Sequence, residues 1–166
     1  MSAEIERFSQ DVHDILVADP GPAGRERVRS RLEEALRDAA FKAASFDGGA
    51  SQRRVLYHDP QLGFLILAHV FLEARRTAPH DHGPSWAIYG QAEGETLMDE
   101  WEVVEKASED RAGKVRLTRS YPLVPGKAHV YNEGVFHSPR RNGPAKLIRI
   151  EGQSTEGLER AVYEPI

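Results

Sequence analysis

The sequence predicts a mainly β fold, an antiparallel barrel or sandwich preceded by two α-helices. Apolar residues recur at helical spacing before residue 48, whereas short apolar stretches separated by turn residues fill the rest of the 166-residue chain. The chain has no cysteine, which excludes disulfides, thiolate nucleophiles and Cys-ligated zinc or iron–sulfur sites.

The helical part is expected in residues 1–48. Ile5, Phe8 and Val12 share one face of a first helix, and a segment rich in Pro and Gly at residues 19–22 ends it. A second helix is expected from residue 23 through Ala40. We expect both helices to pack on the outside of a barrel formed by residues 49–166, in one compact domain.

The second part of the chain alternates short apolar stretches with turn residues, as strands do. The predicted strands are residues 55–57, 64–72, 86–89, 96–104, 115–118, 127–131, 136–137 and 147–150. The strand at 86–89 is expected to stop at Gly90, residues 93–95 to form a turn, and residues 105–114 to form a polar hairpin loop.

The composition limits the class of protein. The net charge of −4 argues against a nucleic-acid surface, and the first residues lack the regions of a signal peptide. The longest apolar run, residues 64–72, is too short to cross a bilayer and contains a histidine. His69 could line the interior of a barrel, but we expect it to be a hydrogen-bonded core histidine. These features predict a cytoplasmic protein without a nucleic-acid or membrane partner.

Three histidines predict a metal site. His80 and His82 project to the same side if their segment is extended, and His137 follows a turn at Gly134. Together they offer three neutral nitrogen ligands and leave coordination positions open, as a catalytic metal requires. Asp81 points the other way and is not expected to be a ligand.

These residues resemble the two motifs of the cupin superfamily. His80 and His82 form the His-x-His of the first motif, Gly94 stands at its closing Gly, and Ala87 occupies the position of its Glu ligand. Residues 132–137 keep the Gly-to-His spacing of the second motif. The resemblance implies a cupin double-stranded β-helix, or jelly-roll barrel. Cupins commonly dimerise, so a homodimer is a further expectation, although the sequence indicates no interface.

The missing Glu makes the chain similar to the cysteine dioxygenase (thiol dioxygenase) family, as a divergent member. That family uses three histidines, and Arg54-Val55-Leu56-Tyr57 resembles the segment whose Arg binds the substrate carboxylate. The chain departs from the family at Leu147, Arg149 and Glu151, where the family carries Ser, His and Tyr. The resemblance therefore extends to the fold and the metal but leaves the exact substrate open.

The resemblance implies an Fe(II)-dependent dioxygenase that oxidises a small carboxylated thiol with O2. Zn, Ni or Mn would bind the same nitrogens, so the ligands alone leave the metal open. Arg54 is expected to pair with a substrate carboxylate, and Trp86 or Tyr89 to form part of the pocket wall. Arg149 and Glu151 share a strand face and are expected to form a polar pair near the metal if that face points inward.

Two alternatives stay open at the level of the sequence. One is dioxygenase, lyase or isomerase chemistry on a non-thiol chelator such as a β-diketone or hydroxy acid. The other is a non-catalytic, metal-bearing protein that binds small molecules.

Overall fold

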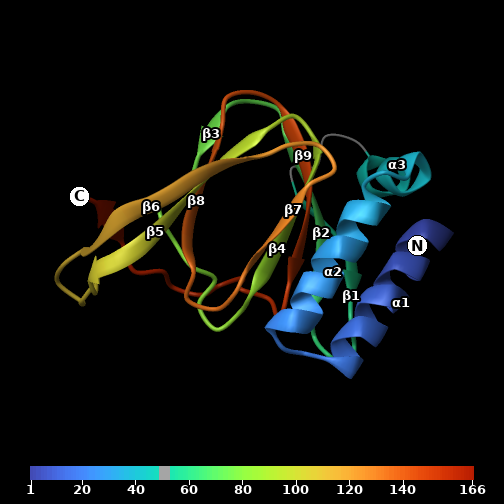
Figure 1. Cartoon of the computed structure of the whole chain (residues 1–166), viewed down its shortest axis with the longest axis horizontal. Helices are drawn as coiled ribbons and strands as arrows, with labels where there is room; N and C mark the ends of the chain where they lie inside the picture. Colours follow the sequence, from blue (N-terminus) through green and yellow to red (C-terminus); the bar gives the residue numbers. More distant parts are fainter. Residues whose placement is uncertain (49–52) are drawn as a thin grey trace.

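The computed structural model describes residues 1–48 and 53–166 and shows a barrel with helices along one side (Figure 1). Within these residues the helices are α1 (Ala3–Ala18), α2 (Pro22–Ala35) and α3 (Ala39–Phe46). The strands are β1 (Arg53–His58), β2 (Leu65–Phe71), β3 (Arg75–Arg76), β4 (Ala87–Glu93), β5 (Thr96–Glu105), β6 (Gly113–Leu123), β7 (Ala128–Tyr131), β8 (Phe136–Arg141), β9 (Ala145–Glu151) and β10 (Tyr163–Pro165).

The described strands form two five-stranded sheets, one on each side of the barrel. The first sheet has the order β1-β2-β9-β4-β7, and we call it the helix-covered sheet; the second has the order β10-β6-β5-β8-β3. Neighbouring strands are antiparallel except for β10 and β6. Strands distant in sequence, such as β2 and β9, lie side by side, which confirms the predicted jelly-roll barrel.

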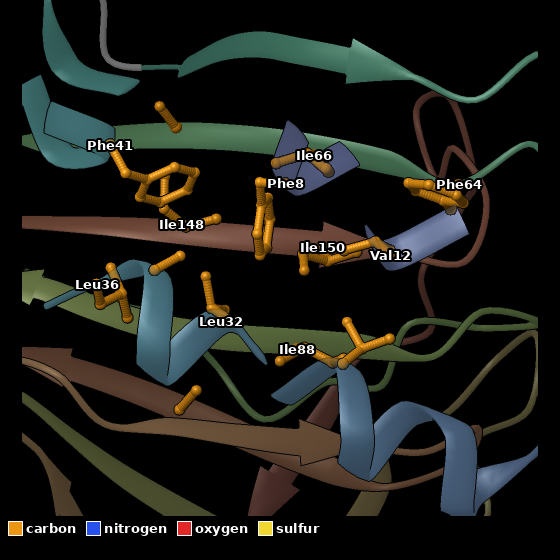
Figure 2. Close-up of a cluster of buried hydrophobic side chains, with 14 of the residues drawn as sticks. Phe8, Val12, Leu32, Leu36, Phe41, Phe64, Ile66, Ile88, Ile148 and Ile150 are labelled. Atoms are coloured by element: carbon orange, nitrogen blue, oxygen red, sulfur yellow. The ribbon is translucent and has the colours of Figure 1, made fainter. Parts of the chain in front are cut away.

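The main core lies between the helices and the helix-covered sheet. Figure 2 shows Phe8 and Val12 of α1, Leu32 of α2 and Phe41 of α3 packed over isoleucines of the strands. The core strands contribute alternate residues to this face: Ile66, Ile88, Ile148 and Ile150. Because side chains alternate along a strand, the intervening residues of the same strands point into the barrel.

The helical region differs from prediction near Asp38. The sequence predicted one helix through Ala40, but α2 ends at Ala35 and α3 begins at Ala39. The Asp38 side chain accepts a hydrogen bond of 2.8 Å from the Ala40 N–H and so caps the new helix. The sequence predicted that the helical part ends at residue 48 and the barrel begins at residue 49. Residue 49 lies outside the described residues, so this boundary stays a prediction.

The strands extend beyond their predicted ends in several places. β4 continues through Gly90 to Glu93, and β6 runs from Gly113 to Leu123. The short strands β3 and β10 were not predicted, since two or three residues carry no period that a sequence pattern can reveal. The β5–β6 hairpin lies on the side of the molecule away from α1 (Figure 1).

Gly90 allows α2 to lie close to the helix-covered sheet. A Cβ atom at this position would lie 2.6 Å from Cδ2 of Leu32 and 2.9 Å from Cδ1 of Leu36. Both leucines are buried, so neither side chain has free space into which to move. Gly90 is thus a residue of close helix-to-strand packing rather than the strand end that the sequence predicted.

No helix of the described residues is long and apolar enough to cross a membrane.

Gly90→Ala should lower the free energy of unfolding by about 1–3 kcal/mol, because the added methyl overpacks the contact with Leu32 and Leu36. Chemical denaturation would measure the change. Gly143→Ala is the matched control, since a Cβ there meets no atom within 4 Å. Equal stability of the two variants would contradict the proposed packing constraint.

Candidate metal centre

Backbone pairing brings two of the three predicted ligands together. The His80 N–H donates to the His137 carbonyl oxygen at 3.1 Å, and the His137 N–H donates to the His80 carbonyl oxygen at 2.9 Å. His82 follows in a turn in which the Ser85 N–H donates to the His82 carbonyl oxygen at 3.1 Å. The three rings consequently form one cluster, with ring centroids 4.7–5.5 Å apart.

Backbone carbonyl groups set the tautomer of two of the three histidine rings. Nδ1 of His80 lies 2.8 Å from the Ala78 carbonyl oxygen, and Nδ1 of His137 lies 3.1 Å from that of Val135. A carbonyl oxygen only accepts hydrogen bonds, so each Nδ1 carries the proton and each Nε2 keeps its lone pair. Nε2 of His82 lies 3.1 Å from Nε2 of His137.

Burial keeps these rings neutral. Burial, together with the neighbouring His80 and Arg149, lowers the pKa of His137 to about 3. The pKa values of His80 and His82 are also lowered, with burial again the largest cause. A neutral imidazole is the form that binds a metal, so no proton must be displaced at neutral pH.

The cluster fits a divalent metal ion. The candidate ligand atoms of the three histidines lie within 4.8 Å of one another. At a metal–nitrogen distance of about 2.1 Å, two ligands at a right angle are about 3.0 Å apart, close to the separation of the His82 and His137 nitrogens. Among the described residues this ligand group contains no carboxylate, and Ala87 is fully buried where a cupin would have its Glu. The three histidines could therefore hold a metal ion.

Two tyrosines form the wall behind the cluster. The Tyr89 hydroxyl lies 3.1 Å from Nε2 of His82, and the Tyr131 ring lies 4.2 Å from that of His137. The Tyr131 hydroxyl is 2.7 Å from the hydroxyl of Tyr121. Burial raises the pKa of Tyr131 well above its usual value, so its ring is a neutral support for His137.

One residue of the cluster, His80, lines a cavity of about 290 Å³ formed mainly by residues of the strands. Its lining has strong positive charge, because arginines project into it from several elements: Arg53, Arg75, Arg141, Arg149 and Arg160. No acidic side chain is among the described residues that line it. His80, Tyr89, Phe71 and Leu147 complete much of the wall. We call this space the arginine cavity.

The C-terminal segment covers the other side of the histidines. A second cavity of about 280 Å³ is lined by His80 and His82 together with Leu158 and Arg160 of this segment. Asp81 also lines it and accepts a hydrogen bond of 3.3 Å from the Gly83 N–H; as predicted, it is not in the group of residues that could hold a metal.

The sequence left open whether Arg149 and Glu151 face inward. In the structure both side chains point into the barrel. Tyr89 pairs with Arg149 across β4 and β9, and Ala87 pairs with Glu151. The Arg149 guanidinium donates to the carboxylate of Glu151, which is only 1% exposed. Arg149 lines the arginine cavity, whereas Glu151 lies behind it as its ion-pair partner.

Arg54 and Trp86 lie elsewhere. The Arg54 guanidinium donates to the carbonyl oxygens of Ala44 and Ser45 at 3.1 and 2.7 Å, and so satisfies the end of α3 rather than a substrate. Trp86 packs in the core beneath the helices, with the Arg25 guanidinium 5.3 Å from its ring. Of the two aromatic residues proposed for the pocket wall, Tyr89 is the one in the cavity.

Sequence reasoning missed most of the arginine cavity. Arg141 follows His137 by four residues on β8, so the period of a strand already places both on one face. His69 was expected to be hydrogen-bonded, yet its buried Nε2 has no hydrogen-bond partner, and the ring lines the cavity. Arg53 lines the cavity in place of the predicted Arg54, because the two adjacent side chains point to opposite faces of β1.

Comparison with known proteins leaves the chemistry open. No family model matches the chain, and no curated protein matches it. Similar solved structures include KdgF from Halomonas sp., which is 19% identical over 60% of this chain and 74% of that one, with a TM-score of 0.43. A cupin superfamily protein from Desulfitobacterium hafniense is 14% identical over 64% of this chain and 84% of that one, also with a TM-score of 0.43. Oxalate oxidase in complex with glycolate is another; it is 18% identical over 66% of this chain and 57% of that one, with a TM-score of 0.47. Since these TM-scores are below 0.5, no substrate, metal or activity follows from them.

Arg54→Gln should lower the free energy of unfolding by about 1–2 kcal/mol, because carbonyl groups at the end of α3 lose charged donors. Metal content should stay unchanged. Denaturation and elemental analysis would test this against Arg37→Gln, which removes the same charge from an exposed position. Lost substrate affinity with unchanged stability would restore the carboxylate-binding role predicted from the sequence.

The metal-free protein should lose stability as the pH falls from 7 to 5. Burial and the charge of Arg149 lower the pKa of His69 from 6.5 to about 3, so in this range the unfolded chain takes up a proton that the folded chain does not. His69 alone should contribute about 2 kcal/mol to this loss. His69→Asn should therefore flatten the pH dependence measured by denaturation, whereas His58→Asn, at an exposed position, should not. Identical slopes in both variants would contradict a neutral buried His69.

Proposed function

We propose that this chain is a mononuclear metal-dependent dioxygenase for a small anionic molecule, with Fe(II) held by His80, His82 and His137. One observation carries the proposal: a neutral three-histidine cluster contributes His80 to the wall of a cavity whose charged lining residues are all arginines. A metal ion and a binding site for its substrate would then share one wall of the barrel. The small molecule and O2 are the proposed partners.

The ligand set suits an open metal site. When bound, iron would supply free coordination positions and a change of redox state for reaction with O2. Three neutral imidazoles leave the charge of a divalent ion uncompensated, which favours an anionic or chelating substrate. Zn, Ni or Mn would bind the same nitrogens, so the choice of Fe(II) rests on the proposed reaction.

The surrounding residues have distinct roles in the proposed enzyme. Arg149 and Arg160 attract an acidic group to the side of the cavity next to the histidines. Glu151 holds the guanidinium of Arg149 in place through their ion pair. The Tyr89 hydroxyl lies 3.1 Å from Nε2 of His82 and offers a hydrogen-bond donor beside the proposed metal position. Phe71 and Leu147 line the cavity with apolar surface that excludes water.

Two substrate classes follow from the residues around the cluster. A small carboxylated thiol is the first class, because the sequence resembles the thiol dioxygenases at the histidines. A non-thiol chelator such as a hydroxy acid or β-diketone is the second. It is favoured because Leu147 and Arg149 line the cavity at positions where thiol dioxygenases carry Ser and His.

Metal analysis and O2 uptake would test the proposal. The protein, purified without a metal-chelating resin and then reconstituted with Fe(II) under anaerobic conditions, should consume O2 with at least one carboxylated thiol or hydroxy acid. His82→Ala should lower metal affinity by more than about 100-fold, since it removes a ligand. His58→Ala is the matched control, with an exposed ring on β1.

The outcomes separate the alternatives. Uptake with thiols supports the thiol class, and uptake with hydroxy acids or β-diketones alone supports the second class. Turnover that persists without O2 or with zinc indicates lyase or isomerase chemistry instead. Binding of metal and small molecules without any turnover would leave a non-catalytic binding protein and would refute the enzyme.

A further inference from the structure

We infer that the substrate carries two acidic groups, and that Arg53, Arg75 and Arg141, gathered around His69, hold the group farther from the three-histidine cluster. This inference rests on the proposed function, because it takes the arginine cavity as the substrate site. It adds a second anion-binding position, which we call the remote subsite.

Arg141 gives the strongest indication of a missing anion. Its side chain is on β8 and the residue is 4% exposed, yet no described carboxylate lies within ion-pair distance of it, and its Nε has no hydrogen-bond partner. The guanidinium instead lies 4.1 Å from the centre of the Phe71 ring. Burial lowers the pKa of Arg141 to about 10, so the group is still charged at neutral pH. A buried charge without a partner is costly, which favours binding of an anion beside it.

Strand pairing gathers further positive charge at the same place. Arg75 pairs with Arg141 across β3 and β8, and Arg53 pairs with His69 across β1 and β2. All four side chains line the arginine cavity. The charges of Arg53, Arg75 and Arg141 all act on the His69 ring, whose Nε2 is buried without a partner. The remote subsite thus offers three guanidinium groups, of which that of Arg141 is buried, and an unpartnered imidazole nitrogen to one oxyanion.

The cavity has a second charged position next to the histidines. Arg160 lines the arginine cavity and also the second cavity beside His80 and His82. Arg149 lies between the two positions: it pairs with Tyr89 on one side and with Leu67 on the other, and its charge acts on both His69 and His80. Glu151 compensates Arg149, but no described acidic residue lines the cavity to compensate Arg75, Arg141 or Arg160. A single carboxylate would leave most of this charge unmatched.

The size of the cavity limits the substrate. Its volume of about 290 Å³ equals the liquid volume of about ten water molecules, which suits a small metabolite rather than a polymer. Guanidinium groups bind carboxylate and phosphate with the same bidentate geometry, so the remote acidic group belongs to one of these two classes. The chain as a whole has a net charge of −4, so this cavity is a local exception and would concentrate anions.

Binding of model anions to the metal-free protein would test the remote subsite. Calorimetry would compare succinate, with two carboxylates, phosphoglycolate, with a phosphate and a carboxylate, and butyrate, which has the chain length of succinate and one acidic group. We expect at least one dianion to bind about tenfold or more tightly than butyrate, because it uses both charged positions. Tighter binding of phosphoglycolate would identify the remote group as phosphate, and tighter binding of succinate would identify it as carboxylate.

Arg75 and Arg76 form a matched pair for this experiment. They are consecutive, exposed residues of β3, but only Arg75 lines the cavity. Arg75→Gln should weaken dianion binding by about tenfold and leave butyrate binding within about twofold, whereas Arg76→Gln should change neither by more than about twofold. Arg141→Met should abolish the preference for the dianion and raise the melting temperature of the ligand-free protein, because it removes a buried unpaired charge.

Several results would overturn the inference. These are the failure of both dianions to bind, equal affinity for succinate, phosphoglycolate and butyrate, or equal effects of Arg75→Gln and Arg76→Gln. Because binding is measured without metal or O2, such a failure would leave the proposed dioxygenase standing. Conversely, an inactive iron-loaded protein that still binds dianions would refute the dioxygenase and retain the remote subsite.

Discussion

The backbone pairing of His80 with His137 is the constraint on which the rest of the site depends. These hydrogen bonds join a loop before β4 to the start of β8 and so bring together ligands that are far apart in the chain. His82 then needs only the short turn at Gly83 and Ser85 to reach the same point. Since backbone groups hold the ligands, the cluster is pre-organised by the barrel and does not depend on flexible side chains.

The helix-covered sheet supports the site through its two faces. One face carries the isoleucines that pack beneath α1 and α2, and the other carries His69, Tyr89 and Arg149. The helices thus bury the strands that display the polar residues, and a rigid core lies directly behind the arginine cavity. This arrangement gives the three N-terminal helices a structural role, because they seal the outer face of the sheet.

Charge in the arginine cavity opposes the stability of the empty protein. Arg141 is buried without a carboxylate partner, and His69 is kept neutral by burial and by the arginines around it. Such groups lower stability unless a ligand compensates them. Arg141 would favour binding of an anion, since its buried guanidinium has no carboxylate partner. The stability that Arg141 and His69 cost the fold is consistent with a binding function for the arginine cavity.

The sequence by itself determined the class of fold and the three histidines. Periodicity of 3.6 and 2 residues marked the helices and most strands, while the spacing around His80, His82 and His137 indicated a shared ligand set without a carboxylate. The tertiary structure alone decided which polar residues meet those histidines. Arg53 and Arg54 are the same residue type side by side, and only the register of β1 against β2 sends the first to the cavity and leaves the second at the end of α3. A local sequence pattern identifies residue types and their period. Strand order and strand pairing decide which distant side chains share a cavity, and they arise only when the whole chain folds.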